Sequence, residues 1–152
     1  MNDTAAPTAA SPSSGTPRHL WIVGGLALLW NGFGAFDYLM TQTGNEAYLA
    51  QFSPEQLEFF TTFPYWVVSF WALAVWGAVL GSVLLLLRKR LAAPVFLVSF
   101  VSMVITSAHN FLLVNGAELM GAAGVVFSGV IFLVALGLWL YARSMARVGV
   151  LA

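Results

Sequence analysis

Four long apolar runs, separated by short polar segments, set the organisation of this chain. They extend over residues 20–40, 65–87, 91–114 and 119–142. Each is long enough to cross about 30 Å of hydrocarbon at about 1.5 Å per residue, and none shows the period-two alternation of a barrel strand. Backbone amides in lipid must be satisfied within their own segment, which such runs achieve as helices. The pattern predicts an all-α fold, an integral membrane four-helix bundle formed as a single domain by residues 18–152.

The composition supports a membrane protein. Of 152 residues, 60% are hydrophobic and 8% charged, and the mean hydropathy is +0.86; soluble domains average about 45–50% apolar and about 25% charged residues. The net charge is zero and no basic patch carries interleaved aromatic residues, so nucleic acid is not expected as a partner. The absence of cysteine excludes disulfides, thiolate metal sites and cysteine nucleophiles.

The first seventeen residues differ from the rest of the chain. Residues 1–17 are rich in Ala, Ser, Thr and Pro and have almost no large apolar side chain, so we expect a disordered tail. A cleaved signal peptide is the alternative, since Arg18 precedes an apolar run. That run ends in bulky residues with no small-x-small site after it, which favours an uncleaved first helix.

The distribution of charge predicts the orientation in the membrane. All the cations fall on one side of the predicted bundle: Arg18, Arg88, Lys89, Arg90, Arg143 and Arg147. The loops on the other side carry Glu46, Glu55, Glu58 and Glu118 and no cation. Because short loops rich in Lys and Arg stay in the cytoplasm, both termini are expected to be cytoplasmic.

The longest connection, residues 41–63, contains a helix start of its own. Ser53 is an N-cap candidate, Pro54 suits the first helical position, and Gln56 completes a capping box. We therefore predict a short helix over about residues 54–62. Its apolar residues, Leu57 and several phenylalanines, suggest an interfacial position on the outer membrane surface or over the bundle; the alternative is a simple connector.

Asp37 is the polar residue that most needs an explanation. A carboxylate at the bilayer centre costs at least about 2.5 kcal/mol, so Asp37 must lie near a surface or have a partner. His109 is the candidate partner within the apolar runs. Asp37 and His109 lie at about 26 Å along two helices that start from the same side, so their depths match. We expect the two side chains to approach within direct or single-water hydrogen-bond reach near the outer face.

Other polar residues extend this candidate site. The site consists of Asn31, Asp37, Thr106, His109 and Asn110, with Trp30, Tyr38, Trp66, Ser69 and Ser102 as lining residues. Ser102, Thr106 and His109 recur at spacings of four and three, which predicts a polar stripe that faces the bundle. One interpretation is a small polar cavity open to the outer side, with a proton-sensitive pair. The other is a clamp that only fixes helix packing.

Small residues and absent motifs narrow the functional classes. Gly77 and Gly81 form a small-xxx-small pair, and Gly121, Gly124 and Gly129 give the fourth run a surface of small residues, which predicts close helix packing.

Sequence motifs of common enzyme and cofactor sites are absent. No phosphate-binding loop, dinucleotide fingerprint or HExxH motif occurs, and no second His lies four residues from His109 in the apolar runs to suggest haem or zinc. No nucleophile, general base and orienting residue can be assembled into a catalytic set within the apolar runs. We therefore expect no enzyme activity, no cofactor and no metal.

Several segments of the chain are distinctive in sequence: WNGFGAFDYLMTQTGNEAYL, FSPEQLEFF, AVWGAVLGSVLLLLRKRLAAPVFLVS, ITSAHNFLL and NGAELMGAAG. Over about Arg18 to Leu151, the chain resembles a group of small four-helix bacterial inner-membrane proteins often labelled as sugar transporters. The resemblance implies a multi-pass protein of the bacterial inner membrane, and it favours a transport role. It assigns no role to individual residues.

Two functional hypotheses follow. The first is a small-solute, sugar-type transport protein with an outward-facing polar cluster; it would act as a homo-oligomer, because four closely packed spans leave little room for a midplane site. The second is a structural or accessory subunit of a membrane complex. The expected partners are the lipid bilayer and, in the two cases respectively, a small-molecule solute or a second membrane protein.

Overall fold

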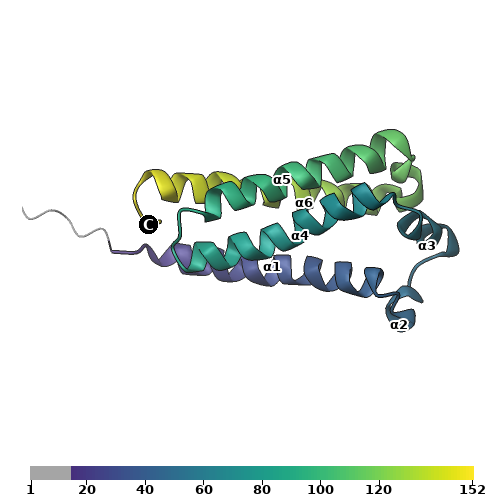
Figure 1. The fold of residues 1–152 in the computed structure, drawn as a ribbon, viewed down its shortest axis with the longest axis horizontal. Helices are drawn as coiled ribbons and strands as arrows, with labels where there is room; N and C mark the ends of the chain where they lie inside the picture. The colour runs from purple at the N-terminus through teal and green to yellow at the C-terminus, as the bar shows by residue number, and fades with distance from the viewer. Residues whose placement is uncertain (1–14) are drawn as a thin grey trace, which may run out of the picture.

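Four long helices run side by side in the computed structural model, which describes residues 15–152 (Figure 1). They are α1 (Arg18–Gln42), α4 (Tyr65–Leu86), α5 (Ala92–Ala108) and α6 (Gly116–Arg147), and α5 continues without a break into a π-helical turn, η1 (His109–Leu113). Each of the four, with η1 counted into α5, is long and apolar enough to cross a membrane. The predicted all-α fold with four candidate spans is therefore confirmed. The predicted tail lies outside the described residues, except for residues 15–17.

The ends of the helices follow from local backbone chemistry. Pro17 and Pro64 precede α1 and α4 in extended conformation. Asn115 adopts the left-handed conformation, with φ 51°, where η1 turns into α6. Gly121 has φ 65° and ψ −179° inside α6, a conformation that suits glycine and kinks the helix near its start. The helix ends lie within five residues of the predicted ones.

The order of packing is α1 on α4, α4 on α5, and α5 on α6. Gly77 and Gly81 make the close approach of α4 to α5: a Cβ atom added to Gly81 would lie 2.8 Å from Phe96 Cδ1, and one on Gly77 would lie 3.1 Å from Ser99 Cβ. The predicted small-residue contact is confirmed for this pair. At Gly121 and Gly129, by contrast, an added Cβ would meet no atom of the described residues within 4 Å, so α6 makes no such contact there.

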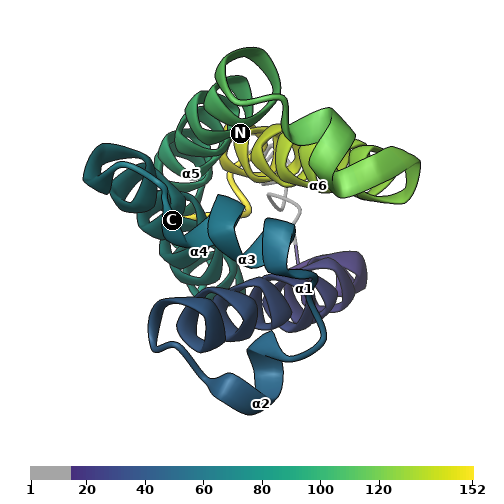
Figure 2. The same cartoon turned by 90° about the vertical axis from the view of Figure 1, so that its right-hand side faces the viewer.

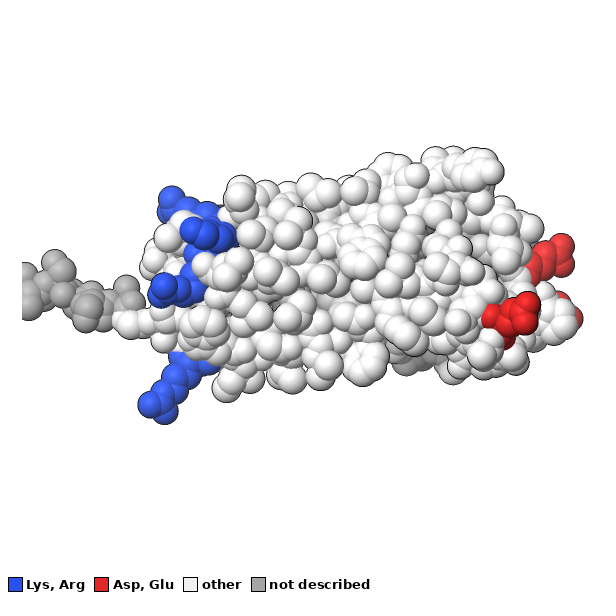
Figure 3. All heavy atoms as spheres, turned by 60° about the horizontal axis from the view of Figure 1, so that its bottom comes forward, with Lys and Arg blue, Asp and Glu red and all other residues white. Residues whose placement is uncertain are grey.

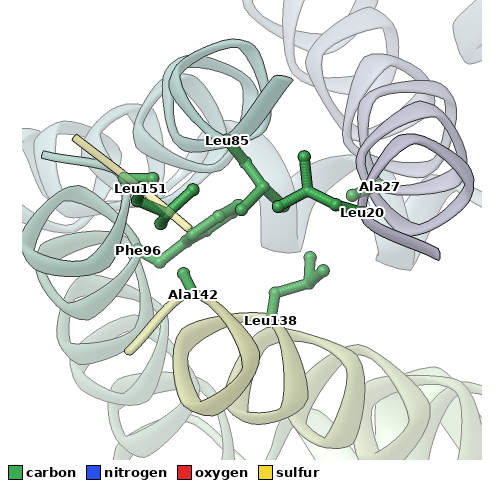
Figure 4. Close-up of a cluster of buried hydrophobic side chains, with 8 residues drawn as sticks. Leu20, Ala27, Leu85, Phe96, Leu138, Ala142 and Leu151 are labelled. Carbon is green, nitrogen blue, oxygen red and sulfur yellow. The ribbon is translucent and has the colours of Figure 1, made fainter. Parts of the chain in front are cut away.

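The hydrophobic core lies at one end of the bundle. Leu20 of α1, Leu85 of α4 and Phe96 of α5 meet Leu138 and Ala142 of α6 there (Figure 4). Leu151 follows α6, folds back and fills the same cluster with 1% of its surface exposed. This end of the bundle is therefore closed by packed side chains.

Charges separate along the length of the molecule. Lys and Arg side chains gather at the end that holds the core, and Asp and Glu side chains gather at the opposite end (Figure 3). We call these the basic end and the acidic end. The separation follows from the chain path, because α1 starts, the α4–α5 loop turns and α6 finishes at the basic end.

Two short helices occupy the loop between α1 and α4, at the acidic end. The predicted loop helix is α3 (Pro54–Thr61): Ser53 Oγ accepts the Gln56 N–H at 3.3 Å, and Gln56 Oε1 accepts the Ser53 N–H at 3.1 Å. The capping box is confirmed. The other helix, α2 (Glu46–Leu49), was not predicted; it is capped by Asn45, whose side chain accepts the Tyr48 N–H at 2.9 Å.

Candidate functional site

A cavity of about 590 Å³ lies between the four long helices, from their middle toward the acidic end. Asn31, Asp37, Thr106 and Asn110 of the predicted polar site line it, together with the predicted lining residue Trp30. These side chains come from α1, α5 and η1, so the fold does bring most of the predicted polar site together. The bundle thus has a packed half at the basic end and a hollow half at the acidic end.

Asp37 has a partner that lies outside the membrane-spanning helices. The Tyr48 hydroxyl of α2 donates a hydrogen bond to Asp37 Oδ1. Burial, and then the bond to Asp37 and its charge, raise the pKa of Tyr48 from 10.0 to about 12. Tyr48 therefore stays protonated at physiological pH and remains a donor. This bond fastens α2 to the acidic end of α1 at the rim of the cavity.

The expected direct contact between Asp37 and His109 is not formed. His109 is 7% exposed, its Nδ1 lies 3.3 Å from Asn110 Oδ1, and its ring meets Trp66 and Phe63 edge-to-face. Asn110, the next residue, faces the cavity instead. Equal depth on two helices does not fix the direction in which a side chain points, because that direction depends on how each helix is rotated about its axis.

The polar stripe on α5 is nonetheless buried as predicted. Ser102, Thr106 and His109 are 3%, 9% and 7% exposed, respectively. Thr106 Oγ1 donates to the Ser102 carbonyl at 3.0 Å, and Ser99 Oγ donates to the Ala74 carbonyl of α4 at 2.5 Å. Only the flank with Ser99, Thr106 and Asn110 borders the cavity; Ser102 and His109 do not line it.

Asn31 has a packing role as well as a place on the cavity wall. Its Nδ2 donates to Ser82 Oγ at 3.0 Å and to the Ala78 carbonyl at 3.3 Å, both on α4. Ser82 is fully buried and donates in turn to the Ala78 carbonyl at 2.8 Å. Asn31 therefore clamps α1 to α4 where the cavity gives way to packed helices.

Three other predicted lining residues lie away from the cavity. Tyr38 packs edge-to-face on Trp71, with ring centroids 4.9 Å apart. Trp66 is 47% exposed, and its ring covers His109. Ser69 is exposed and donates to the Tyr65 carbonyl of its own helix. These three residues surround the site without forming its wall.

Sequence reasoning missed several residues of the cavity wall: Tyr48, Trp71, Ser107, Phe127 and Ser128. Two patterns could have indicated some of them. Asn45 followed by Glu46 is a helix start, which would have placed Tyr48 on a short helix near the end of α1. Ser107 precedes Asn110 by three residues, so the two share a helix face. For Trp71 and Phe127 no pattern separates a cavity-facing aromatic ring from a lipid-facing one.

The wall combines uncharged hydrogen-bonding groups and aromatic rings with one carboxylate. Among the residues that the structure describes, Asp37 is the one charged side chain on the wall, and no Lys or Arg borders the cavity. Within residues 15–152, no three His, Asp or Glu side chains cluster so as to hold a metal ion. Amide and hydroxyl groups from Asn110, Thr106 and Ser107 offer hydrogen bonds beside the aromatic rings of Trp30, Trp71 and Phe127. Such a wall suits a molecule that combines hydroxyl groups with apolar surface.

The fold and composition define a class: an all-α, multi-pass membrane protein with four candidate spans. Comparison of the chain with protein-family models, curated proteins and solved structures finds no match.

Proposed function

We propose that this chain is a small-solute transport protein of the bacterial inner membrane, and that its cavity binds an uncharged, hydroxyl-rich solute of sugar type. The observation that carries the proposal is the convergence of Asn31, Asp37, Thr106 and Asn110 on one cavity. Its volume of about 590 Å³ falls within the range of about 300–1,000 Å³ that is usual for small-molecule sites. The resemblance to proteins labelled as sugar transporters supports the same role.

The wall chemistry supports a neutral, sugar-type solute. The Asp37 carboxylate accepts hydrogen bonds from hydroxyl groups, and the Asn110 amide both donates and accepts them. The rings of Trp30 and Trp71 provide apolar faces that suit the C–H faces of a sugar ring. An anionic solute would meet the Asp37 charge and would find no Lys or Arg on the wall that residues 15–152 form.

The charge distribution supports an orientation for this role. The basic end would lie in the cytoplasm, since Lys and Arg favour that side, and both termini would be cytoplasmic. The cavity would then lie in the outer half of the membrane, with α3 along the outer surface. Passage to the cytoplasm would require the core around Leu20, Leu85 and Phe96 to open, or a second copy of the chain to complete the path.

Protection of an introduced cysteine tests solute binding. Ser107→Cys places a thiol on the cavity wall of a chain without cysteine, and Thr43→Cys places one at an exposed position outside it. D-glucose, D-xylose and sorbitol at high concentration are offered while a small neutral methanethiosulfonate modifies the thiol. We expect at least one polyol to slow modification of the Ser107→Cys protein and none to slow modification of the Thr43→Cys protein. Equal rates with and without every polyol would overturn the proposal.

A cavity-filling variant provides the second arm. Gly34 lines the cavity, and an added Cβ there would meet no described atom within 4 Å, so Gly34→Leu fills the space without a backbone clash. Gly32→Leu is the matched control, because Gly32 is also unobstructed but is exposed and lies off the cavity wall. Each change is combined with Ser107→Cys. Polyol protection of the introduced thiol should be lost with Gly34→Leu and kept with Gly32→Leu.

An accessory role in a membrane complex remains the second candidate, favoured by the surface of α6. Gly121 and Gly129 leave open space, and Ala122 and Ala123 between them are exposed. In lipid, such small side chains let another helix approach closely. Mass determination of the protein purified in mild detergent separates the candidates: a stoichiometric second chain favours the complex, and a homo-oligomer favours the transporter.

A further inference from the structure

The ring of four helices is open on one side. α1 packs on α4 and α6 packs on α5, but α1 and α6 are not a closely packed pair, as the end view shows (Figure 2). An aromatic contact, Trp30 with Phe127, crosses between them, with ring centroids 6.1 Å apart. Phe33 and Phe127 both line the cavity and are 67% and 57% exposed. The cavity therefore reaches the molecular surface between α1 and α6.

This opening lies at the depth of the hydrocarbon layer. Trp30 is about 18 Å along α1 from Arg18, and Phe33 is about 22 Å from it. The apolar part of a bilayer is about 30 Å thick. A molecule that passes between Phe33 and Phe127 would therefore come from the acyl chains of the bilayer.

An aromatic cluster, formed by Phe52, Phe59, Phe60 and Phe63, lies at the acidic end of the bundle. The rings pack edge-to-face, with centroids 5.6 Å apart for Phe52 and Phe60 and 5.0 Å apart for Phe59 and Phe63. Phe63 continues the contact to Trp71 on the cavity wall, at 6.3 Å. α3, which carries Phe59 and Phe60, lies across this end of the bundle (Figure 2). α3 thus lies over the acidic end of the bundle, while α1 and α6 leave the gap between them open.

We infer that the ligand of this cavity is an uncharged amphiphile, with a hydroxylated head group beside Asp37 and Asn110 and an alkyl chain that leaves between α1 and α6. This inference rests on the proposed sugar-type solute and adds an apolar tail to it. The wall supports a neutral head, because its hydrogen-bonding groups other than Asp37 are uncharged and, in the described part of the chain, no Lys or Arg borders the cavity to hold a phosphate or carboxylate. Phe33 and Phe127, which are exposed at the opening, provide the apolar contact for the alkyl chain of the ligand.

The test uses octyl β-D-glucoside as the probe. The Ser107→Cys protein is purified without glycoside detergents and placed in phosphatidylcholine nanodiscs. Octyl glucoside, D-glucose, octyltrimethylammonium and octyl phosphate are compared for protection of the introduced thiol, with Thr43→Cys as control. We expect octyl glucoside to protect at a concentration at least tenfold lower than D-glucose, and the two charged octyl compounds to protect less than octyl glucoside. Gly34→Leu should abolish protection, and Gly32→Leu should preserve it.

A ligand with a brominated alkyl tail tests where that tail lies. Bromine quenches tryptophan fluorescence on contact, so 8-bromooctyl β-D-glucoside should give a saturable quenching component that Trp30→Phe reduces. Trp66→Phe is the control, because Trp66 lies off the cavity wall. Equal losses in the two variants would overturn the proposed path of the chain.

The outcomes separate this inference from the proposed function. If D-glucose protects as well as octyl glucoside, the tail contributes nothing; the amphiphile is overturned and the sugar-type solute stands. If all three octyl compounds protect equally, or the cationic one protects best, the neutral head is wrong and both proposals fall. If octyl glucoside protects and no free polyol does, the free sugar-type solute is overturned and the amphiphile is the ligand. If no compound protects the thiol of the Ser107→Cys protein, both proposals fall.

Discussion

The contact between Asp37 and Tyr48 shows what a sequence reveals at the scale of one residue. The cost of a charge in lipid predicts that Asp37 needs a surface or a partner, and that requirement is met. The partner could not be predicted, because it lies in the loop rather than in another span. The depth of His109 follows from residue counting, but the direction of its side chain depends on how the helices are rotated. Asn110 faces the cavity for that reason.

Tyr48 should titrate well above the ordinary pKa of a tyrosine. Its pKa is raised from 10.0 to about 12 by burial and by Asp37, so its contribution to stability is present below pH 10 and is lost as the pH rises toward about 12. The ultraviolet absorbance of the phenolate, as a difference between the wild-type protein and Tyr48→Phe, measures this titration. Asp37→Asn should lower the Tyr48 pKa, because the raising effect of the carboxylate is lost while that of burial, the largest single cause, remains. A difference component near pH 10 in the wild-type protein would contradict the Asp37 contact.

At the scale of helices, the sequence predicted which helices form and how long they are better than it predicted how they pack together. The apolar runs and the Ser53 capping box predicted the four spans and α3, because both depend on local chemistry. The cavity depends on which helices pack together, and α1 with α6 is the pair that does not. The apolar pattern also did not predict the kink at Gly121 or the π-helical turn at His109. Hydrophobic patterns alone carry no information about them.

The junction between η1 and α6 should be sensitive to a single methyl group. A Cβ on Gly116 would lie 2.6 Å from the backbone oxygen of Asn110, which cannot move without shifting the cavity wall. Gly116→Ala should lower the free energy of unfolding by about 1–3 kcal/mol. Gly129→Ala is the matched control: its Cβ meets no atom of the described chain, so it should be neutral or stabilise the helix by up to about 1 kcal/mol. Unfolding followed by circular dichroism in detergent measures both, and equal stabilities would show that the junction is looser than the structure indicates.

For the whole molecule, charge and packing divide the bundle in the same way. The core that joins α1, α4, α5 and α6 lies at the basic end, and the cavity lies toward the acidic end. The positions of the cations in the sequence predicted this polarity, because successive spans alternate in direction and bring all the cations to one end. They did not predict that one half would be packed and the other hollow. That division depends on side-chain volumes at facing positions, such as Phe96 against Gly81.

The orientation in the membrane can be tested with three single cysteines. Gln51, Ala117 and Arg90 are all exposed, so differences in labelling will report the side of the membrane rather than burial. Gln51 and Ala117 lie at the acidic end and Arg90 at the basic end. If Lys and Arg mark the cytoplasmic side, an impermeant maleimide added to cells with a permeabilised outer membrane should label Gln51→Cys and Ala117→Cys but not Arg90→Cys. A permeant maleimide should label all three, which controls for reactivity. Labelling of Arg90→Cys by the impermeant reagent alone would place the basic end outside, and the cavity would then open from the cytoplasmic half of the bilayer.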